Sequence, residues 1–174
     1  MKLLDFLQGK WLGHPLHPAV VHVPLGLWPI ATVLDAIAFF GDGANHTLAR
    51  LACYAVILGL AVVLIAVPTG IADWTSIKKG RPAWQLALYH LLFNAAATVF
   101  WAINLALRLS AWNEIEPVTT GVLATSVLGS LLVLVGGYIG SRLVFAYGIG
   151  VARQSKKKWR KLAIEGGSKV PEES

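Results

Sequence analysis

Residues 48–74 read LARLACYAVILGLAVVLIAVPTGIADW, with no charged residue between Arg50 and Asp73. A helix needs about 20 apolar residues to cross the hydrocarbon of a bilayer, and soluble cores rarely contain an uncharged apolar run of this length. The stretch therefore predicts a membrane-spanning helix. The composition agrees, because 56% of the 174 residues are hydrophobic and only 14% are charged, compared with about 25% charged in soluble proteins.

Three further apolar stretches are bounded by charges and turn residues, and they cover residues 18–40, 82–109 and 118–147. The connections between the four stretches are short, so sequential neighbours should pack antiparallel. We expect an all-α polytopic membrane protein, an up-and-down bundle of four transmembrane helices. Its predicted parts are an interfacial entry segment at 1–17, the transmembrane domain at 18–151 and a basic tail at 152–174.

Positive charge lies on one side of this arrangement. The cationic residues of that side are Lys2, Lys10, Lys78, Lys79, Arg81, Arg153, Lys156, Lys157, Lys158, Arg160 and Lys161. The opposite loops contain Asp42, Glu114 and Glu116. The positive-inside rule then predicts that both termini are cytoplasmic. Arg50 and Arg108, at the outer ends of their helices, are expected to extend to the lipid headgroups.

The same charge distribution bears on partners. The net charge of +6 is explained by membrane topology, so it does not indicate that the protein binds nucleic acid. The first partner that we expect is the lipid bilayer. The basic tail is expected to rest on the anionic cytoplasmic leaflet, or to dock a soluble partner. The first apolar segment has no small-residue cleavage site, which argues against a removable signal peptide. A single cysteine, Cys53, excludes a disulfide framework or a cysteine-based metal site within the chain.

Ionisable groups inside a span are costly and usually mark a function or a structural pair. At 1.5 Å per residue, His22 lies about 6 Å and His90 about 12 Å inside their helices, both in the cytoplasmic half. Helix two brings Asp73 to the same half, and helix four brings Arg142. The third span also has a narrow polar stripe, made of His90, Asn94, Trp101, Asn104 and Arg108. That stripe should face protein or a cofactor.

These positions suggest a haem site. Two histidines from different helices can hold one b-type haem iron, and glycine on a facing helix lets a flat porphyrin approach. We therefore predict haem b between helices one and three, with a binding set of His22, His90, Asn94, Gly137 and Arg142. Alternatively, these histidines are core residues whose role is to form hydrogen bonds within the bundle. The GxxxG-like spacing on helix four is also typical of helix packing.

The entry segment HPLHPAVVHVP, residues 14–24, offers a second possibility. His14 and His17 each precede a proline, which favours an extended backbone at the interface, where they could simply be anchors. A non-haem metal could instead use histidine and carboxylate ligands, although no strict ligand spacing supports it. The candidate metal set is His14, His17, His22, Asp73 and His90.

Four motifs resemble a bacterial membrane family, the domain of unknown function 2231. They are GHPLHPAVVHVPLGLW (13–28), GIADW (70–74), YHLLFN (89–94) and GGYIGSRLVFAYGIGV (136–151). The resemblance implies a four-helix protein of the bacterial inner membrane. Members are sometimes fused to Rieske or cytochrome-like modules, which suggests electron transfer. His14, His17, His22 and His90 are the histidines that look like motif positions.

The function we expect is a membrane-embedded electron-transfer or redox-complex subunit, without independent catalytic activity and with other membrane or redox subunits as partners. One alternative is a non-catalytic scaffold subunit of a larger complex, and another is a non-haem metal-binding protein. A proton path or transporter through His22, Asp73 and His90 is a further alternative. With no internal repeat evident, four helices make a thin enclosure for alternating access.

Overall fold

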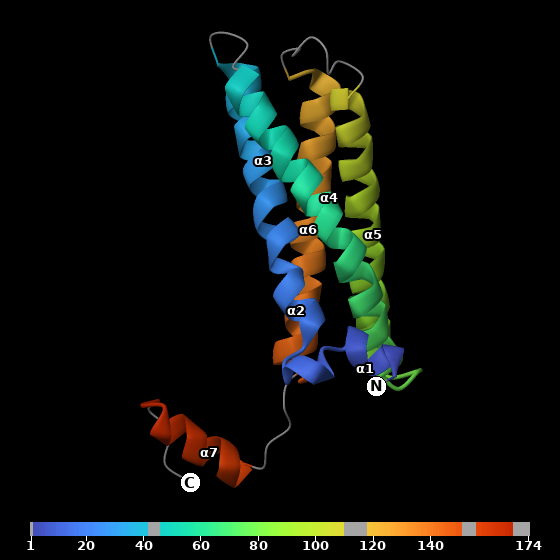
Figure 1. Ribbon diagram of the computed structural model, residues 1–174, viewed down its shortest axis with the longest axis vertical. Coiled ribbons are helices and arrows are strands. Elements are labelled where there is room, and N and C mark those ends of the chain that lie inside the picture. Colours follow the sequence, from blue (N-terminus) through green and yellow to red (C-terminus); the bar gives the residue numbers. More distant parts are fainter. Residues whose placement is uncertain (1, 42–45, 110–117, 151–155, 169–174) are drawn as a thin grey trace.

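The computed structural model describes residues 2–41, 46–109, 118–150 and 156–168, and its described elements are all helical. Figure 1 shows four long rods side by side. The first combines α2 (Leu16–Val20) and α3 (His22–Phe40), which meet at Val21. The others are α4 (His46–Thr75), α5 (Pro82–Leu109) and α6 (Thr120–Phe145). All four rods are long and apolar enough to cross a membrane, which confirms the predicted fold class.

Shorter helices lie at one end of the bundle and in the tail. α1 (Leu3–Leu7) and a 3₁₀ turn, η1 (Lys10–Leu12), precede α2, and α7 is Lys156–Glu165. The Gln8 side chain connects this entry segment to α4 by donating a hydrogen bond to the Ala72 carbonyl at 2.9 Å. In the same segment, the hydrogen bond and ion pair with Lys10 hold the pKa of the partly exposed Asp5 carboxyl below its usual range. The predicted tail boundary at 151–152 lies outside the described residues.

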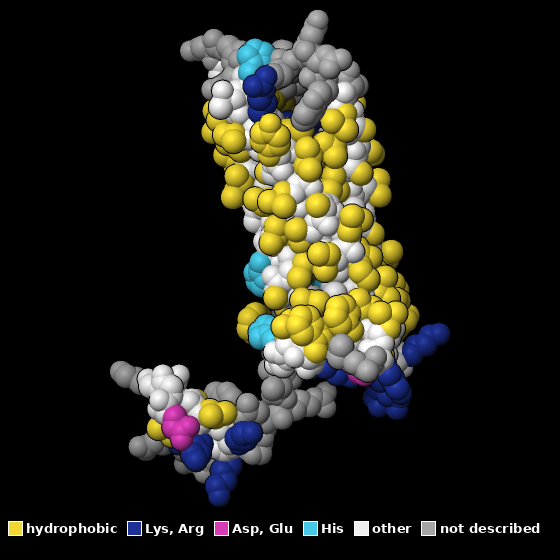
Figure 2. Space-filling view, viewed as in Figure 1, with side chains coloured by type: hydrophobic (Ala, Val, Ile, Leu, Met, Phe, Trp, Pro, Cys, Tyr) yellow, Lys and Arg dark blue, Asp and Glu magenta, His cyan; other side chains and the backbone are white. Residues whose placement is uncertain are grey.

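The rods form a closed square. α3 packs against α4 and α6, and α5 packs against the same two helices, so α3 and α5 are diagonal. We call the end where α2 and α5 begin the basic end, and the opposite end the far end. In Figure 2 hydrophobic side chains cover the sides of the bundle, while Lys and Arg gather at the basic end below it. A surface that is apolar on its sides is what a helix bundle in lipid requires.

The two halves of the chain repeat one pattern, contrary to the expectation that no internal repeat exists. His17 and Trp28 are followed 73 residues later by His90 and Trp101, and Asp35 is followed at the same offset by Arg108. On the second helix of each half, Gly59 and Gly70 correspond to Gly129 and Gly140, 70 residues later. Residues 11 apart on a helix share one face about 16 Å apart. The bundle is thus two similar hairpins side by side, a parallel repeat about an axis along the bundle.

The repeat explains the packing of the core. Trp28 lies against Gly59, where a Cβ would come within 2.2 Å of the indole nitrogen, and Trp101 lies against Gly129 in the same way at 2.7 Å. The two indoles then stack on each other across the diagonal, with ring centroids 5.4 Å apart. Both are buried, at 2% and 0% exposure. Glycine is required on α4 and α6 because any side chain there would occupy the space of the indoles.

Candidate functional site

Two histidines meet on the axis of the bundle, toward its basic end. The rings of His17 on α2 and His90 on α5 have centroids 6.1 Å apart and nearly perpendicular planes, with an interplanar angle of 89°. They come from diagonal rods, so neither is a neighbour of the other along a helix or across a hairpin. We call this pair the histidine layer.

Each ring is fixed by a backbone carbonyl of the facing helix. His17 Nδ1 lies 2.9 Å from the Ala66 oxygen on α4, and His90 Nδ1 lies 2.8 Å from the Gly136 oxygen on α6. A carbonyl can only accept, so Nδ1 must be the protonated nitrogen in both rings. In the neutral tautomer this leaves the lone pair on Nε2. Both imidazoles therefore have the tautomer that metal-binding histidines adopt when the second nitrogen donates to a carbonyl.

Glycines make room for the rings. A Cβ at Gly70 would lie 2.7 Å from His17 Cε1, and a Cβ at Gly140 would lie 2.8 Å from His90 Cε1. Each glycine is one turn beyond the carbonyl acceptor on its own helix, so the repeat supplies the same carbonyl and glycine pocket twice. The absence of a side chain at Gly70 and Gly140 thus lets each imidazole pack directly against the backbone of the neighbouring helix.

The structure places His22 differently from the prediction. His22 begins α3 with an exposed side chain, and the ring that faces His90 belongs to His17. Five residues turn a helix by about 140°, so two such side chains lie on different faces. The expectation that His22 and His90 face each other across helices one and three is therefore wrong. The expectation that His17 is only an interfacial anchor is also wrong, since its ring packs inside the bundle.

The predicted non-haem metal set is not assembled. His14 is exposed and its Nδ1 bonds the neighbouring Pro15 carbonyl at 2.9 Å, whereas Asp73 is half-buried one turn beyond Thr69 on α4. Within the described residues, no three histidine, cysteine or carboxylate side chains lie close enough to hold a metal ion. His17 and His90 are the two members of the set that contact each other.

The other predicted cofactor residues have mixed positions. Asn94 is one turn from His90 and donates to its main-chain oxygen at 2.7 Å, against Gly136. Gly137 faces Leu25, with 3.1 Å from a built Cβ to a leucine methyl, so it does not border the imidazoles. Arg142 is exposed on α6. On α6, the glycines that contact His90 are Gly136, through its carbonyl, and Gly140, which packs against the ring.

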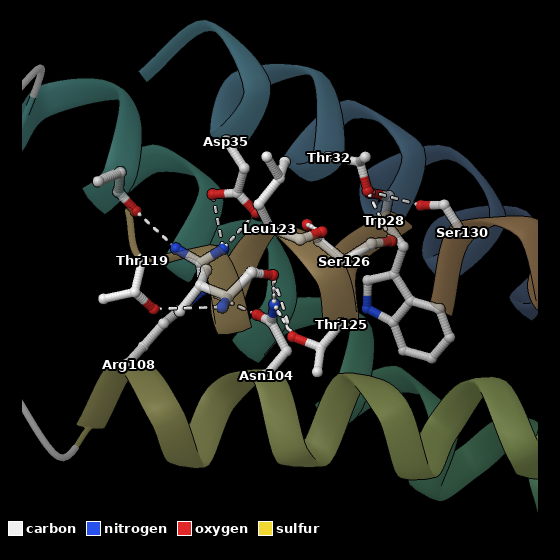
Figure 3. Close-up of polar contacts among 12 residues, drawn as sticks. Trp28, Thr32, Asp35, Asn104, Arg108, Thr119, Leu123, Thr125, Ser126 and Ser130 are labelled. Atoms are coloured by element: carbon white, nitrogen blue, oxygen red, sulfur yellow. Dashed lines mark hydrogen bonds and ion pairs between the residues drawn. The ribbon is translucent and has the colours of Figure 1, made fainter. Parts of the chain in front are cut away.

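A second polar cluster, toward the far end, was not predicted. Figure 3 shows Asp35 of α3 and Arg108 of α5 pointing toward each other. Arg108 Nη2 lies 2.7 and 2.5 Å from the two carboxylate oxygens, and Arg108 Nε donates to Asn104 Oδ1 at 2.8 Å. The side chains are 0% and 7% exposed. The expectation that Arg108 extends to the headgroups is wrong, because a buried carboxylate on the diagonal helix neutralises it.

Between these two polar layers lie the stacked indoles of Trp28 and Trp101. Their Nε1 atoms are buried without a hydrogen-bond partner. A pair of buried indoles in the middle of the bundle does not favour a continuous hydrophilic path for protons or solutes. The arrangement is better suited to holding one ligand near the basic end.

Comparisons with known proteins identify one family. The family described as "Predicted membrane protein (DUF2231)" matches residues 13–153, which include the histidine layer, the indole layer and the Asp35–Arg108 pair. No curated protein and no solved structure matches the chain.

Proposed function

The chain belongs to the DUF2231 family of predicted membrane proteins, and we propose from the geometry of the histidine layer that it is a membrane-embedded electron-transfer subunit that binds b-type haem. The residues that would hold the haem iron are His17 and His90, the former in place of His22. The observation that supports this is the pair of imidazoles on diagonal helices, with each Nδ1 held by a carbonyl and each Nε2 left to bind.

The distance fits one shared iron. An imidazole nitrogen lies about 2 Å from the metal that it binds, so two rings on one metal have centres about 6 Å apart. The observed centroid separation is 6.1 Å. Gly70 and Gly140, on the two flanking helices, let the two rings approach each other at this level, since a side chain at either position would meet an imidazole. The donor pair and its separation therefore fit an iron that two imidazoles would hold.

The protein contributes orientation and a low dielectric. The Nδ1 bonds to the Ala66 and Gly136 carbonyls fix both rings and increase the basicity of Nε2. The indole layer closes the site toward the far end, and the helices exclude water. A bound haem would supply reversible one-electron chemistry, with its potential set by ligand type and burial. We place the protein in the bacterial inner membrane, with the basic end in the cytoplasm.

An absorption spectrum of the purified protein tests the proposal. We expect a Soret band that is lost in both His17→Ala and His90→Ala. The matched control is His22→Ala, which removes an exposed histidine five residues from His17 and should keep the band. Circular dichroism checks that each variant retains its helices.

Two outcomes would overturn the proposal. A colourless, metal-free protein that copurifies with other membrane subunits would refute haem binding and favour the scaffold function. A Soret band lost in His22→Ala but kept in His17→Ala would show that the wrong histidine pair has been assigned.

A further inference from the structure

The histidine layer lies much closer to one end of the bundle than to the other. His90 is eight residues beyond Pro82, where α5 begins, and 19 residues before Leu109, where it ends. At 1.5 Å per residue these spacings are about 12 Å and about 28 Å. Electron transfer slows steeply with distance, so an electron carrier held by this layer exchanges electrons at the basic end.

Aromatic side chains occupy the space between the histidine layer and the basic end. Trp74 lies one turn beyond Gly70 on α4, and Trp84 lies six residues before His90 on α5. Their ring centroids are 5.1 Å apart. Trp74 has a buried Nε1 without a hydrogen-bond partner. The two rings are tilted by 32° to each other, and their π systems shorten the stretch of saturated groups that an electron would cross between the histidine layer and the surface.

The surface directly beyond this aromatic pair is cationic. Lys78, Lys79 and Arg81 are exposed in the turn between α4 and α5. In the described part of the chain none of the three forms an ion pair, whereas Lys10 is engaged by Asp5. Toward the far end Arg108 is buried and neutralised by Asp35, and Arg50 is an exposed cation of α4. A cationic surface increases the encounter rate with anionic partners, most strongly at low ionic strength.

We infer that the α4–α5 turn, backed by Trp74 and Trp84, is the electron-exchange surface of the protein and receives an acidic, soluble one-electron carrier. This inference rests on the proposed haem function. Anionic lipid headgroups have the same charge as such a carrier, so the test must separate the two.

Charged one-electron oxidants serve as probes of this surface. The reduced protein, in neutral detergent, is mixed with ferricyanide or with hexaammineruthenium(III), and haem oxidation is followed by stopped flow. Each ferricyanide takes up one electron and becomes ferrocyanide, with no proton transferred and no bond formed. Neutral detergent leaves both ends of the bundle accessible and contains no anionic lipid.

The informative variant is Lys79→Glu, and the matched control is Arg50→Glu, which makes the same change in net charge at an exposed site near the far end. At low salt, we expect Lys79→Glu to lower the rate of haem oxidation by ferricyanide about threefold and to raise the rate of oxidation by the ruthenium cation. The effect should disappear at high salt, where the screening length falls to about 3 Å. Arg50→Glu should leave both rates unchanged.

Three results would overturn the inference. One is an equal response to both variants, which would reflect net charge alone. Another is no response to Lys79→Glu in a protein that does contain haem. The third is an effect that appears only in vesicles containing phosphatidylglycerol, which would assign the cations to lipid. Absence of the Soret band is a separate result, because it would refute the proposed function itself.

Discussion

The buried ion pair makes a quantitative prediction for Arg108→Leu. Both carboxylate oxygens of Asp35 accept from Arg108 Nη2. Arg108 also donates to Asn104 Oδ1 at 2.8 Å and to the Ala49 carbonyl at 3.3 Å. Removing the guanidinium leaves a carboxylate of 0% exposure with no cation. Breaking a buried pair in this way typically costs about 3–5 kcal/mol.

The double variant Asp35→Leu/Arg108→Leu should recover most of that loss. Replacing both partners of a buried pair by apolar residues is often neutral, because the desolvation of two charges is also removed. Asn104 Oδ1 still loses a donor, so a deficit of about 1–2 kcal/mol should remain. Arg50→Leu, at an exposed site in the same half of the bundle, should change stability by less than about 0.5 kcal/mol.

The assay is unfolding by sodium dodecyl sulfate in mixed micelles, followed by circular dichroism. The midpoint should move while the slope of the transition stays the same, since the surface exposed on unfolding is nearly constant. A single variant that loses less than about 1 kcal/mol would refute the reasoning, because breaking a buried pair costs more than that. A double variant as unstable as the sum of the two singles would also refute it, since the cost would then not come from an orphaned charge.

Two further predictions concern the glycine pockets and the indole layer. Gly140→Ala places a methyl group 2.8 Å from His90 Cε1, so it should cost about 1–3 kcal/mol and weaken the Soret band. Its control, Gly26→Ala, meets nothing within 4 Å and should be neutral or stabilising in the same measurements. Trp101→Ala removes a 0% exposed indole stacked on Trp28, so the detergent titration should show a loss of about 3–5 kcal/mol.

The four spans were predictable because hydropathy is a local property of the chain. The third predicted span, Pro82–Leu109, coincides with α5, and the others differ from the observed helices by a few residues at their ends. Relative depth was less predictable, because His17, one residue into α2, meets His90, eight residues into α5. The polar stripe of the third span, which includes Trp101 and Asn104, does face protein, and both residues are buried.

The direction of a side chain around its helix was harder to predict. His17 lies five residues, or about 7.5 Å along a helix, before His22. The proline after His17 suggested an extended backbone there, yet α2 begins at Leu16 and turns His17 inward. Arg108 was assigned to the headgroups because its depth permits it. Depth arithmetic contains no information about the partner, Asp35, on a helix far away in sequence.

The internal repeat was visible in the sequence and was missed. Histidine precedes tryptophan by 11 residues in both halves, and glycine precedes glycine by 11 residues on the following helices. The intervening residues differ, so overall similarity does not reveal it. A search for spaced pairs on one helix face would have found His17, and not His22, as the counterpart of His90.

The unlike charges at related positions have a consequence for assembly. Two copies of the first hairpin joined about the same axis would bring two Asp35 carboxylates together, and two copies of the second would bring two Arg108 guanidinium groups together. Only one of each gives a neutral centre. If the polypeptide were divided in the turn at residues 76–81, the halves should therefore recombine as a heterodimer, with self-association disfavoured by like charge in a low-dielectric interior.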